Sequence, residues 1–232
     1  MKNNNQNTKK YTTSKINWVS KTQKNDSLTV YALPGRRGYI NAKNGDIVID
    51  AKTNNYRKAW VFSEGLAAVM KEGKIGFINA KNEVVIPFQF DYSDQCRMWD
   101  FGYLFHYGYC IMTNKDGDLG LIDSTGKWVV KPAYDEIWAP HENGYRIIVN
   151  EGKHGILDSK CNIVYPTEYS CVDVLSDGFI LTKDGKKWQV DFEGNITQPF
   201  MFDGTYYLNY PIGYNESGEI QYAFADYINY EV

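Results

Sequence analysis

The stretch that decides the fold reads Gly65-Leu-Ala-Ala-Val-Met-Lys-Glu-Gly73-Lys-Ile-Gly-Phe-Ile-Asn79-Ala-Lys-Asn-Glu-Val-Val-Ile-Pro87. In it a glycine stands six residues before an asparagine, and short aliphatic runs flank both. This offset between Gly and Asn or Asp occurs five times, with successive spacings of 38, 44, 35 and 33 residues. A period in this range indicates a repeat protein. The pairs are Gly35 and Asn41, Gly73 and Asn79, Gly117 and Asp123, Gly152 and Asp158, and Gly185 and Asp191.

Each repeat contains three short apolar runs separated by two tight turns. The first turn centres on the glycine, which adopts a positive φ without steric cost. The second opens with Asn or Asp, whose side chain can bond to its own backbone two residues on. We therefore expect positive φ at Gly73, Gly117, Gly152 and Gly185. Three residues after the Asn or Asp, the left-handed position of the second turn falls on Asn44, Asn82, Gly126, Cys161 and Gly194.

The pattern predicts an all-β fold of five antiparallel meanders with three to four strands each. Prolines 87, 132, 166 and 199 are expected to end the third strands, because proline cannot donate to a ladder. The connector that follows can form a fourth, outer strand. A degenerate, shortened sixth repeat is expected over residues 209–220. The blades can close into a propeller-like ring, which we favour, or form an open superhelical β-solenoid.

These features resemble the WG-repeat family, also called KWG repeats. The resemblance covers about residues 28–205, and its clearest matches are residues 73–79, 117–123 and 152–158. The repeats are divergent, because the tryptophan that names the family is absent from every one. In its place stand Arg37, Ile75, Leu119, His154 and Lys187, and in the fifth repeat Trp188 also replaces the second glycine of the motif. The resemblance implies a repeat architecture and no particular activity.

Composition narrows the class of protein. The 232 residues, 43% of them hydrophobic, suffice for one all-β domain. We expect residues 1–26 to be a polar, disordered lead and residues 27–232 to form a single repeat domain. No apolar window approaches the ~20 residues of a transmembrane helix, and the amino terminus has no apolar stretch typical of a secretory signal. We therefore expect a cytoplasmic protein that does not associate with membranes.

Charge and cysteine spacing argue against two further classes. The net charge is −3 and the sequence has no basic stripe, which argues against nucleic-acid binding. Cysteines 96, 110, 161 and 171 match no zinc pattern and contain no C-x-x-C, so we expect free, mostly buried thiols. We expect neither a metal nor a cofactor.

The sequence contains no evident catalytic set. His106, His141 and His154 lie in no metal-binding spacing and beside no evident nucleophile, so alanine at each should leave activity largely intact. The turns and connectors account for the repeated acids, and the glycines are spaced for hairpins rather than for a phosphate loop. We therefore expect a protein that is not an enzyme.

One segment departs from the repeat. From Pro87 to Gly108 there are 21 residues, where the corresponding segments of later repeats have 12, and the excess falls within residues 92–107. Insertions into repeats often form the binding face. Our candidate binding residues are Arg97, Met98, Trp99, Tyr103 and His106 in the insertion and Trp138 in a connector. Alternatively, the aromatic residues at positions 99, 101, 103 and 105 alternate as in an extra packed strand.

The leading hypothesis is a non-enzymatic module that binds another protein. An inhibitor or immunity-type protein is one concrete form of it. The alternative is a lectin-like module that binds carbohydrate or peptide through aromatic faces, and a hydrolase whose acids meet only in the fold comes third. Exposed aromatic residues near Asp and Asn in a groove would favour the lectin, whereas two carboxyls with raised pKa in one pocket would favour the enzyme.

Overall fold

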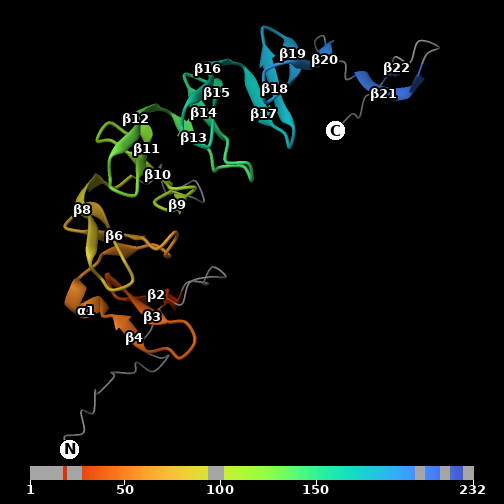
Figure 1. Ribbon diagram of the computed structural model, residues 1–232. Helices are drawn as coiled ribbons and strands as arrows, with labels where there is room; N and C mark the ends of the chain where they lie inside the picture. The colour runs from red at the N-terminus through yellow and green to blue at the C-terminus, as the bar shows by residue number, and fades with distance from the viewer. Residues whose placement is uncertain (1–17, 20–27, 94–101, 202–206, 215–219, 227–232) are drawn as a thin grey trace, which may run out of the picture.

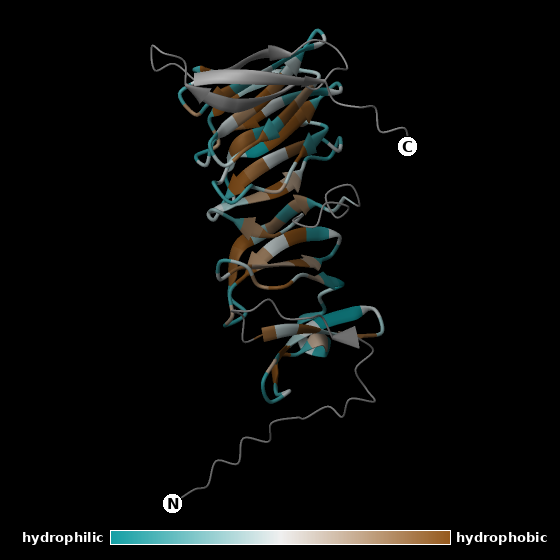
Figure 2. Ribbon diagram, turned by 90° about the vertical axis from the view of Figure 1, so that its right-hand side faces the viewer, coloured by the Kyte–Doolittle hydropathy of each residue, from teal (hydrophilic) through white to brown (hydrophobic). Residues whose placement is uncertain are grey.

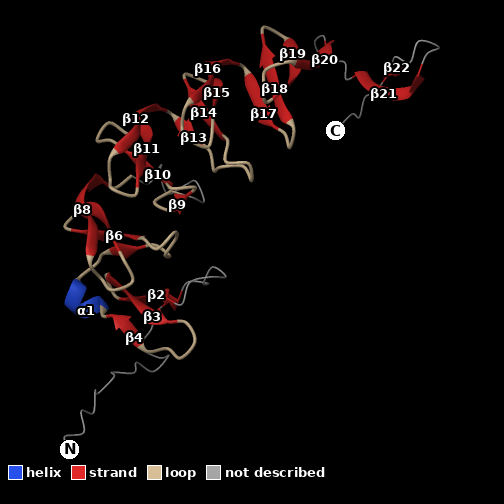
Figure 3. Cartoon of the chain, viewed as in Figure 1, coloured by secondary structure: helices blue, strands red, loops and turns tan. Residues whose placement is uncertain are grey.

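The computed structural model describes residues 18–19, 28–93, 102–201, 207–214 and 220–226. This part of the chain is almost entirely β-structure, interrupted by one short helix (Figure 3). Its strands form five antiparallel sheets of four strands and a final two-stranded pair, and each sheet uses strands that are consecutive in sequence. The repeated antiparallel meander expected from the sequence is confirmed.

The first three sheets occupy the amino-terminal half of the chain. In order they contain β1 (Trp18–Val19), β2 (Leu28–Leu33), β3 (Arg36–Asn41) and β4 (Ile47–Ile49); β5 (Lys58–Ala59), β6 (Ala67–Lys71), β7 (Lys74–Ile78) and β8 (Val84–Asp91); and β9 (Phe105–His106), β10 (Tyr109–Thr113), β11 (Leu119–Asp123) and β12 (Trp128–Tyr134). The helix α1 (Ala51–Asn54) follows β4.

Two more sheets and a hairpin complete the array. They contain β13 (Glu136–Ile137), β14 (Arg146–Asn150), β15 (Lys153–Leu157) and β16 (Ile163–Tyr169); β17 (Cys171–Val174), β18 (Gly178–Lys183), β19 (Lys186–Asp191) and β20 (Ile196–Met201); and the pair β21 (Tyr207–Tyr214) and β22 (Ile220–Asp226). The connector after each repeat leads into one further short strand, β9, β13 or β17, which pairs with the next repeat and begins its sheet. This confirms the fourth strand expected from the sequence.

The first turns adopt the backbone that their glycines permit. Positive φ occurs at Gly73 (81°), Gly117 (98°), Gly152 (68°) and Gly185 (72°), as predicted. Next to three of them the preceding residue is also left-handed, as Glu151 (φ 50°) shows for Gly152. Two consecutive positive φ values are typical of the type I′ turn, whose twist matches that of the flanking strands.

The second turns are built on the Asn or Asp side chain. In the third repeat the Asp123 carboxylate accepts hydrogen bonds from the backbone of Thr125 (2.8 Å) and Lys127 (3.1 Å). The left-handed residue three positions on is Asn82, Gly126, Cys161 or Gly194 in the last four repeats, as expected. For the first repeat the expectation was wrong: the positive φ falls on Gly45 instead of Asn44, because this turn is one residue longer.

In the first four repeats the second glycine of the motif lies beneath a bulge. Ile75 pairs with Phe90 and Phe77 with Ile86, so two residues of β7 face a four-residue step of β8. A Cβ at Gly76 would lie 2.8 Å from the carbonyl oxygen of Ile86, so only glycine fits without a shift. The prolines lie within these bulges. Our expectation that they end the third strand was wrong, because the strand continues through the bulge and pairs again beyond it.

In the first repeat the bulge is enlarged into α1. Tyr39 pairs with Ile49 and Arg37 bridges to Tyr56, so the intervening chain is long enough to form a helical turn. The Asp50 side chain caps it by accepting from the backbone of Lys52 (2.7 Å). The bulge position therefore tolerates insertion without loss of the sheet.

The core lies between successive sheets rather than inside any one of them. In β14, Ile148 belongs to the cluster shared with the third sheet, whereas Ile147 and Val149 belong to the cluster shared with the fifth. Alternate residues of a strand point to opposite faces, so a strand covered on both faces is apolar throughout. Figure 2 shows the result, with hydrophobic strands stacked inside and hydrophilic turns at the margins.

The stacked sheets follow an open arc (Figure 1). The blades are propeller-like, as predicted, but the first and fifth sheets stand at opposite ends of the arc and do not meet. This is the open arrangement that we had kept as the alternative to a ring. The first strand of each sheet, as β9, β13 and β17 show, lies on the concave side of the arc. The last strand, which is the third strand of the expected meander, lies on the convex side, as β8, β12 and β16 show.

The two ends of the chain are only partly described. The expected polar lead, residues 1–26, lies outside the described residues except for Trp18–Val19. At the other end the sixth repeat is a hairpin. The turn expected around Asn209 is absent, because β21 runs through it as one strand. The turn expected at Asn215 falls in residues 215–219, outside the described part.

Candidate binding surface

Exposed aliphatic side chains recur at two adjacent positions of the last strand in the five four-stranded sheets. They lie on the third strands, five or six residues after the Asn or Asp of the second turn, or seven in the first repeat with its longer turn. Each is between 43% and 62% exposed. We call this set the outer row: Val48, Val84, Val85, Val129, Ile163 and Ile196.

The outer row follows from the way the sheets stack. The last strand is an edge of each four-stranded sheet, and the last strands β8, β12 and β16 lie on the convex side, where neighbouring sheets diverge (Figure 1). Single exposed apolar residues are ordinary, but here at least one of two adjacent positions of this strand is exposed in each of five successive sheets. Edge strands also carry unpaired backbone groups, which can pair with another chain.

A cleft of about 510 Å³ opens between the second and third sheets. Phe90 and Trp128 form its aromatic part, with ring centroids 5.7 Å apart and planes at 89°. The Trp128 ring extends over Gly120, where a Cβ would lie 2.8 Å from it. Glycine in the motif therefore creates the space in which this ring lies. The lining consists of Gln89, Phe90, Asp91, Thr113, Asn114, Gly126, Lys127 and Trp128.

Most polar groups of the cleft are already engaged. Lys74 binds Asp91 at 2.5 Å. The Asn114 side chain donates to Asp118 (2.9 Å), and its oxygen accepts from the backbone of Asp116 and Asp118. Thr113 differs, because it is only 1% exposed and its hydroxyl has no hydrogen-bond partner among the described residues. A buried unsatisfied polar group of this kind calls for an explanation.

Two of the sequence-predicted binding residues in the insertion lie in the described part, and one is buried. Tyr103 belongs to the core: its hydroxyl accepts from the Ser93 N–H (2.7 Å), and its ring lies 4.6 Å from that of Trp60. As an exposed binding residue Tyr103 was therefore wrongly assigned. Phe105 is also buried and lies in β9, which pairs with β10 as the regular first strand of the third sheet, so the extra strand of the alternative interpretation does not appear in residues 102–106. Arg97, Met98 and Trp99 lie outside the described residues.

His106 and Trp138 lie in different settings. His106 is half-buried in β9, and its pKa is lowered chiefly by burial, with Glu64 opposing and Arg146 adding to the shift. Trp138 is exposed, donates its indole N–H to Glu136 (2.8 Å) and contacts His154 edge-on. His154 occupies the position of the family tryptophan, so its contact with Trp138 supports a structural role there.

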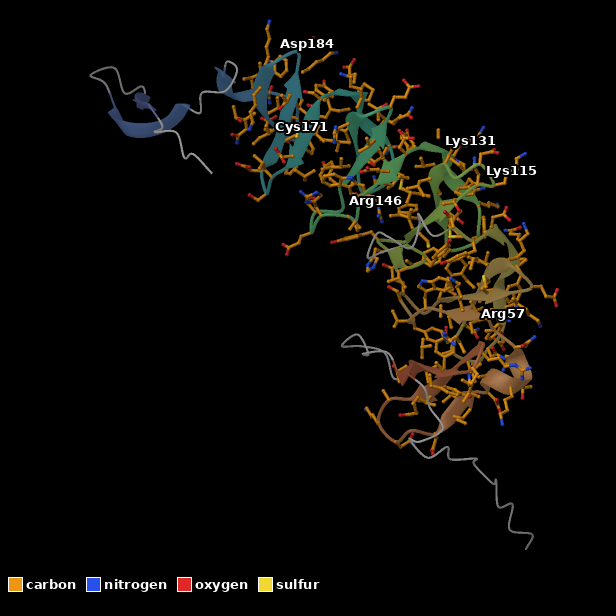
Figure 4. All side chains as sticks on the ribbon, turned by 180° about the vertical axis from the view of Figure 1, so that it is seen from behind. Arg57, Lys115, Lys131, Arg146, Cys171 and Asp184 are labelled. Atoms are coloured by element: carbon orange, nitrogen blue, oxygen red, sulfur yellow. The ribbon has the colours of Figure 1, made fainter. Side chains whose placement is uncertain are left out.

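Sequence reasoning missed two features. The first is the cleft, whose signal was Trp128, the aromatic residue at a position held by Val84, Ile163 and Ile196 in other repeats. The second is Arg146, a buried arginine on the concave side that donates to the carbonyl of His106 (2.7 Å) (Figure 4). Its signal was a charged residue within an otherwise apolar strand.

The repeated aspartates are structural. The side-chain hydrogen bond from Thr125 lowers the pKa of Asp123, and that from Asn195 lowers the pKa of Asp191. For Asp158 burial raises the pKa, but hydrogen bonds from Asn162 and Lys160 outweigh it and lower the pKa overall. These carboxylates are held charged by turn geometry.

The three cysteines of the described part are free, as expected, but the expectation of mostly buried thiols was wrong. Cys110 is buried, Cys161 is half-buried and Cys171 is exposed. Burial raises the pKa of Cys161 to about 11, which makes it a poor nucleophile. Cys96 lies outside the described part.

The described residues contain no group of three or more His, Cys, Asp and Glu side chains placed to hold a metal ion. Nor does this part of the chain contain a helix with the length and apolar character needed to cross a membrane.

Comparison with known families identifies the repeat. The family model for the WG-containing repeat matches residues 38–74, 75–116 and 120–153. Each matched unit begins at or just before a second glycine of the motif, Gly38, Gly76 or Gly120, the residues that lie under the bulges. No curated protein matches the chain.

Solved structures match the chain at low sequence identity and with TM-scores below 0.5. PorZ of Porphyromonas gingivalis, a surface component of the type-IX secretion system, is 10% identical over 82% of this chain and 28% of its own, with a TM-score of 0.40. Hsv2 of Kluyveromyces lactis is 8% identical over 76% of this chain and 62% of its own, with a TM-score of 0.44. The Pan2 WD40 domain of Neurospora crassa is 16% identical over 87% and 69%, with a TM-score of 0.36. The chain covers less than two thirds of the length of PorZ and of Hsv2. These similarities do not indicate what the chain binds.

Proposed function

Because the chain belongs to the family of proteins built from WG-containing repeats, we propose that it is a non-enzymatic module that binds another protein through the outer row. Stacked repeats hold side chains at a regular spacing over an extended surface, which suits recognition of a partner. An inhibitor or immunity-type protein is one concrete form of this function. The cytoplasmic location expected from the sequence stays a prediction.

The observation that carries the proposal is the recurrence of the outer row. An isolated exposed valine needs no explanation, but large or contiguous apolar surface marks an interaction site. The row uses β-branched residues on edge strands, where a partner can contact side chains and unpaired backbone together.

The state of the repeated acids supports a binding role over a catalytic one. A general acid needs a carboxyl with a raised pKa. Asp123 and Asp191 instead have lowered pKa values, and their oxygens accept the hydrogen bonds of their own turns.

The second candidate is binding of carbohydrate. The observation that favours it is an aromatic ring, Trp128, beside Gln89 and Asp91 in a cleft. Aromatic faces with amide and carboxylate neighbours suit sugar rings, and this is the groove that the sequence hypothesis required.

Affinity purification from the native host tests the proposal, with the parent beside two variants. The first variant carries Val84→Thr, Val129→Thr and Ile163→Thr, which keep β-branched side chains and strand propensity but remove apolar surface. The second is Trp138→Ala, which changes an exposed aromatic residue directly after β13, a strand that lies on the concave side. Circular dichroism and thermal unfolding check that both retain the fold.

The parent and Trp138→Ala are expected to retain a near-stoichiometric protein partner, identified by mass spectrometry. The outer-row variant should recover it at least tenfold less, which corresponds to about 1.4 kcal/mol of binding free energy. Equal recovery by the outer-row variant, or selective loss with Trp138→Ala, would show that the binding face lies elsewhere.

A further inference from the structure

We propose that the cleft between β8 and β12 receives one tyrosine side chain of the partner, within a segment that also carries acidic residues. This inference rests on the proposed function and names the chemistry of the segment that the partner presents. Four observations support it: the aromatic walls of the cleft, the hydrogen bonds and ion pair that already occupy most of its polar groups, the exposed Lys127 at its rim, and its position within the outer row.

The size and walls of the cleft fit a large apolar side chain. At about 510 Å³ it falls within the range of ligand pockets, ~300–1,000 Å³. Both sheets contribute to it, since Phe90 lies near the end of β8 and Trp128 begins β12. The two rings already meet edge to face. A third ring placed against them would extend this cluster in the geometry that aromatic pairs prefer.

The polar groups argue against a sugar. A sugar ring needs free acceptors and donors for several hydroxyls, but Asn114 uses its oxygen and its NH₂ group in its own turn. Asp91 is held by Lys74. Asn114 and Asp91, whose chemistry would suit a sugar, are therefore engaged, and the aromatic wall and Gln89 remain.

One buried group favours a ring that ends in a hydroxyl. Thr113 lines the cleft although it is almost fully buried, and its hydroxyl has no partner among the described residues. A tyrosine hydroxyl can both donate and accept, so it can satisfy this group, whereas phenylalanine cannot.

The charge of the cleft favours acidic neighbours. Lys127 lines it and is exposed. It forms no ion pair with any described residue, although its charge helps to lower the pKa of Asp123 in its own turn, whereas Lys74 neutralises the acid Asp91. Lys115 and Lys131 project from the same sheet on the convex side (Figure 4). Carboxylates flanking the tyrosine would meet Lys127 at the rim, where such pairs fix orientation and association rate.

The cleft also lies where an interface anchor belongs. Trp128 occupies the position that Val84 and Ile163 hold in the adjacent sheets, so the cleft interrupts the middle of the outer row. Binding energy concentrates in a few aromatic anchors that fill central pockets and are surrounded by weaker contacts. The outer row would supply those weaker contacts.

Fluorescence anisotropy of labelled synthetic peptides tests the inference on the full chain. The first peptide has one tyrosine with two acidic residues on each side. In the second, phenylalanine replaces the tyrosine, and in the third, lysines replace the acids. The parent is compared with Lys127→Glu, an exposed change that leaves the aromatic wall intact. The matched control is Lys160→Glu, another exposed lysine, in the second turn of the next sheet.

The parent and Lys160→Glu are expected to bind the acidic tyrosine peptide with equal affinity, at least threefold more tightly than the phenylalanine peptide. Lys127→Glu should weaken binding at least tenfold, and the lysine peptide should not bind the parent. Thr113→Val, which keeps the side-chain shape, should lower the affinity of the tyrosine peptide to that of the phenylalanine peptide.

Three outcomes overturn the inference: equal binding by the parent and Lys127→Glu, equal binding of the tyrosine and phenylalanine peptides, or competition by a neutral glucose trisaccharide alone. Its failure is distinguishable from failure of the proposed function. If a protein partner co-purifies and is lost with the outer-row variant but no peptide binds, only the cleft assignment is wrong. If the partner is retained by the outer-row variant, the proposed function itself is wrong.

Discussion

The third and fifth sheets differ at the position of the second glycine of the motif. In the third sheet it is Gly120, and the two-residue step from Leu119 to Leu121 faces a four-residue step from Tyr134 to Val130. In the fifth sheet the position is Trp188, and the two-residue step from Lys187 to Gln189 faces only a three-residue step from Met201 to Gln198. The wide bulge thus accompanies the glycine, and a narrower bulge accompanies the side chain.

This difference separates two kinds of glycine in one motif. The opening glycines have positive φ and open space around the missing Cβ, as at Gly73 and Gly152. The second glycines are not left-handed, but a Cβ on them would strike the backbone of the bulge. The first kind serves a turn and the second serves close approach of two strands. Three experiments can break or sharpen the comparison, and they follow in order of expected effect.

Gly120→Ala should have the largest effect. The new Cβ would lie 2.5 Å from the carbonyl oxygen of Val130 and 2.8 Å from the Trp128 ring, so backbone or ring must move. Overpacking of this kind costs about 3 kcal/mol of unfolding free energy, measured by urea denaturation. The control is Trp188→Phe in the fifth sheet, which keeps a Cβ and an aromatic ring and should cost less than ~1.5 kcal/mol. A Gly120→Ala protein with the parent's midpoint would show that the bulge does not need glycine.

Gly152→Val should have an intermediate effect. Nothing lies within 4 Å of a Cβ at Gly152, so the cost comes from holding a β-branched residue at φ 68°. We expect about 1–2 kcal/mol, from the same urea measurement. Gly152→Asn is the matched control, because Asn tolerates the left-handed region and Asn82 adopts it in this protein. If Val and Asn have equal stability at this position, backbone strain is not what selects glycine in the first turns.

Acid titration of the second turns should have the smallest effect. The third and fifth sheets share this feature despite their different bulges, since hydrogen bonds lower the pKa of Asp123 and of Asp191. A carboxyl with a lowered folded-state pKa stabilises the fold above its unfolded pKa, near 4. That contribution is lost as the pH falls through the folded-state pKa. Because these groups are largely exposed, the effect stays below those of the glycine changes.

The variant for this test replaces Asp123, Asp158 and Asp191 by Asn. The turn should survive, because Asn79 holds the same place in the second repeat and accepts from the backbone of Lys81 (3.0 Å). We expect the stability of the parent to fall more steeply than that of the variant between pH 5 and 2, roughly the interval over which such carboxyls titrate. Parallel curves from thermal unfolding would show that the turns make no contribution to acid sensitivity.

Much of the local structure was predictable because one residue type suffices to explain it. The positive φ at Gly117 and Gly185 and the turn built on Asp123 follow from backbone sterics and short-range hydrogen bonds. The strand through Pro87 was not predictable in this way, because its continuation depends on Gly76 in the neighbouring strand, which leaves room for the bulge.

The candidate surface was predictable only in part. The excess residues after Pro87 identified an insertion, but the burial of Tyr103 depends on Trp60 and Ser93, which no sequence spacing brings together. The cleft was not predictable for the same reason, since Phe90 and Trp128 come from different repeats.

The sequence by itself determined the repeat, its strands and its turns, because each depends on residues a few positions apart. The tertiary structure alone decided that the described sheets form an open arc, that the outer row is exposed on successive sheets and that a cleft opens between β8 and β12 (Figure 1). The physical reason is that these features depend on the small rotation between stacked sheets, which sets which edges diverge. That rotation arises from packing between repeats, and no single repeat contains it.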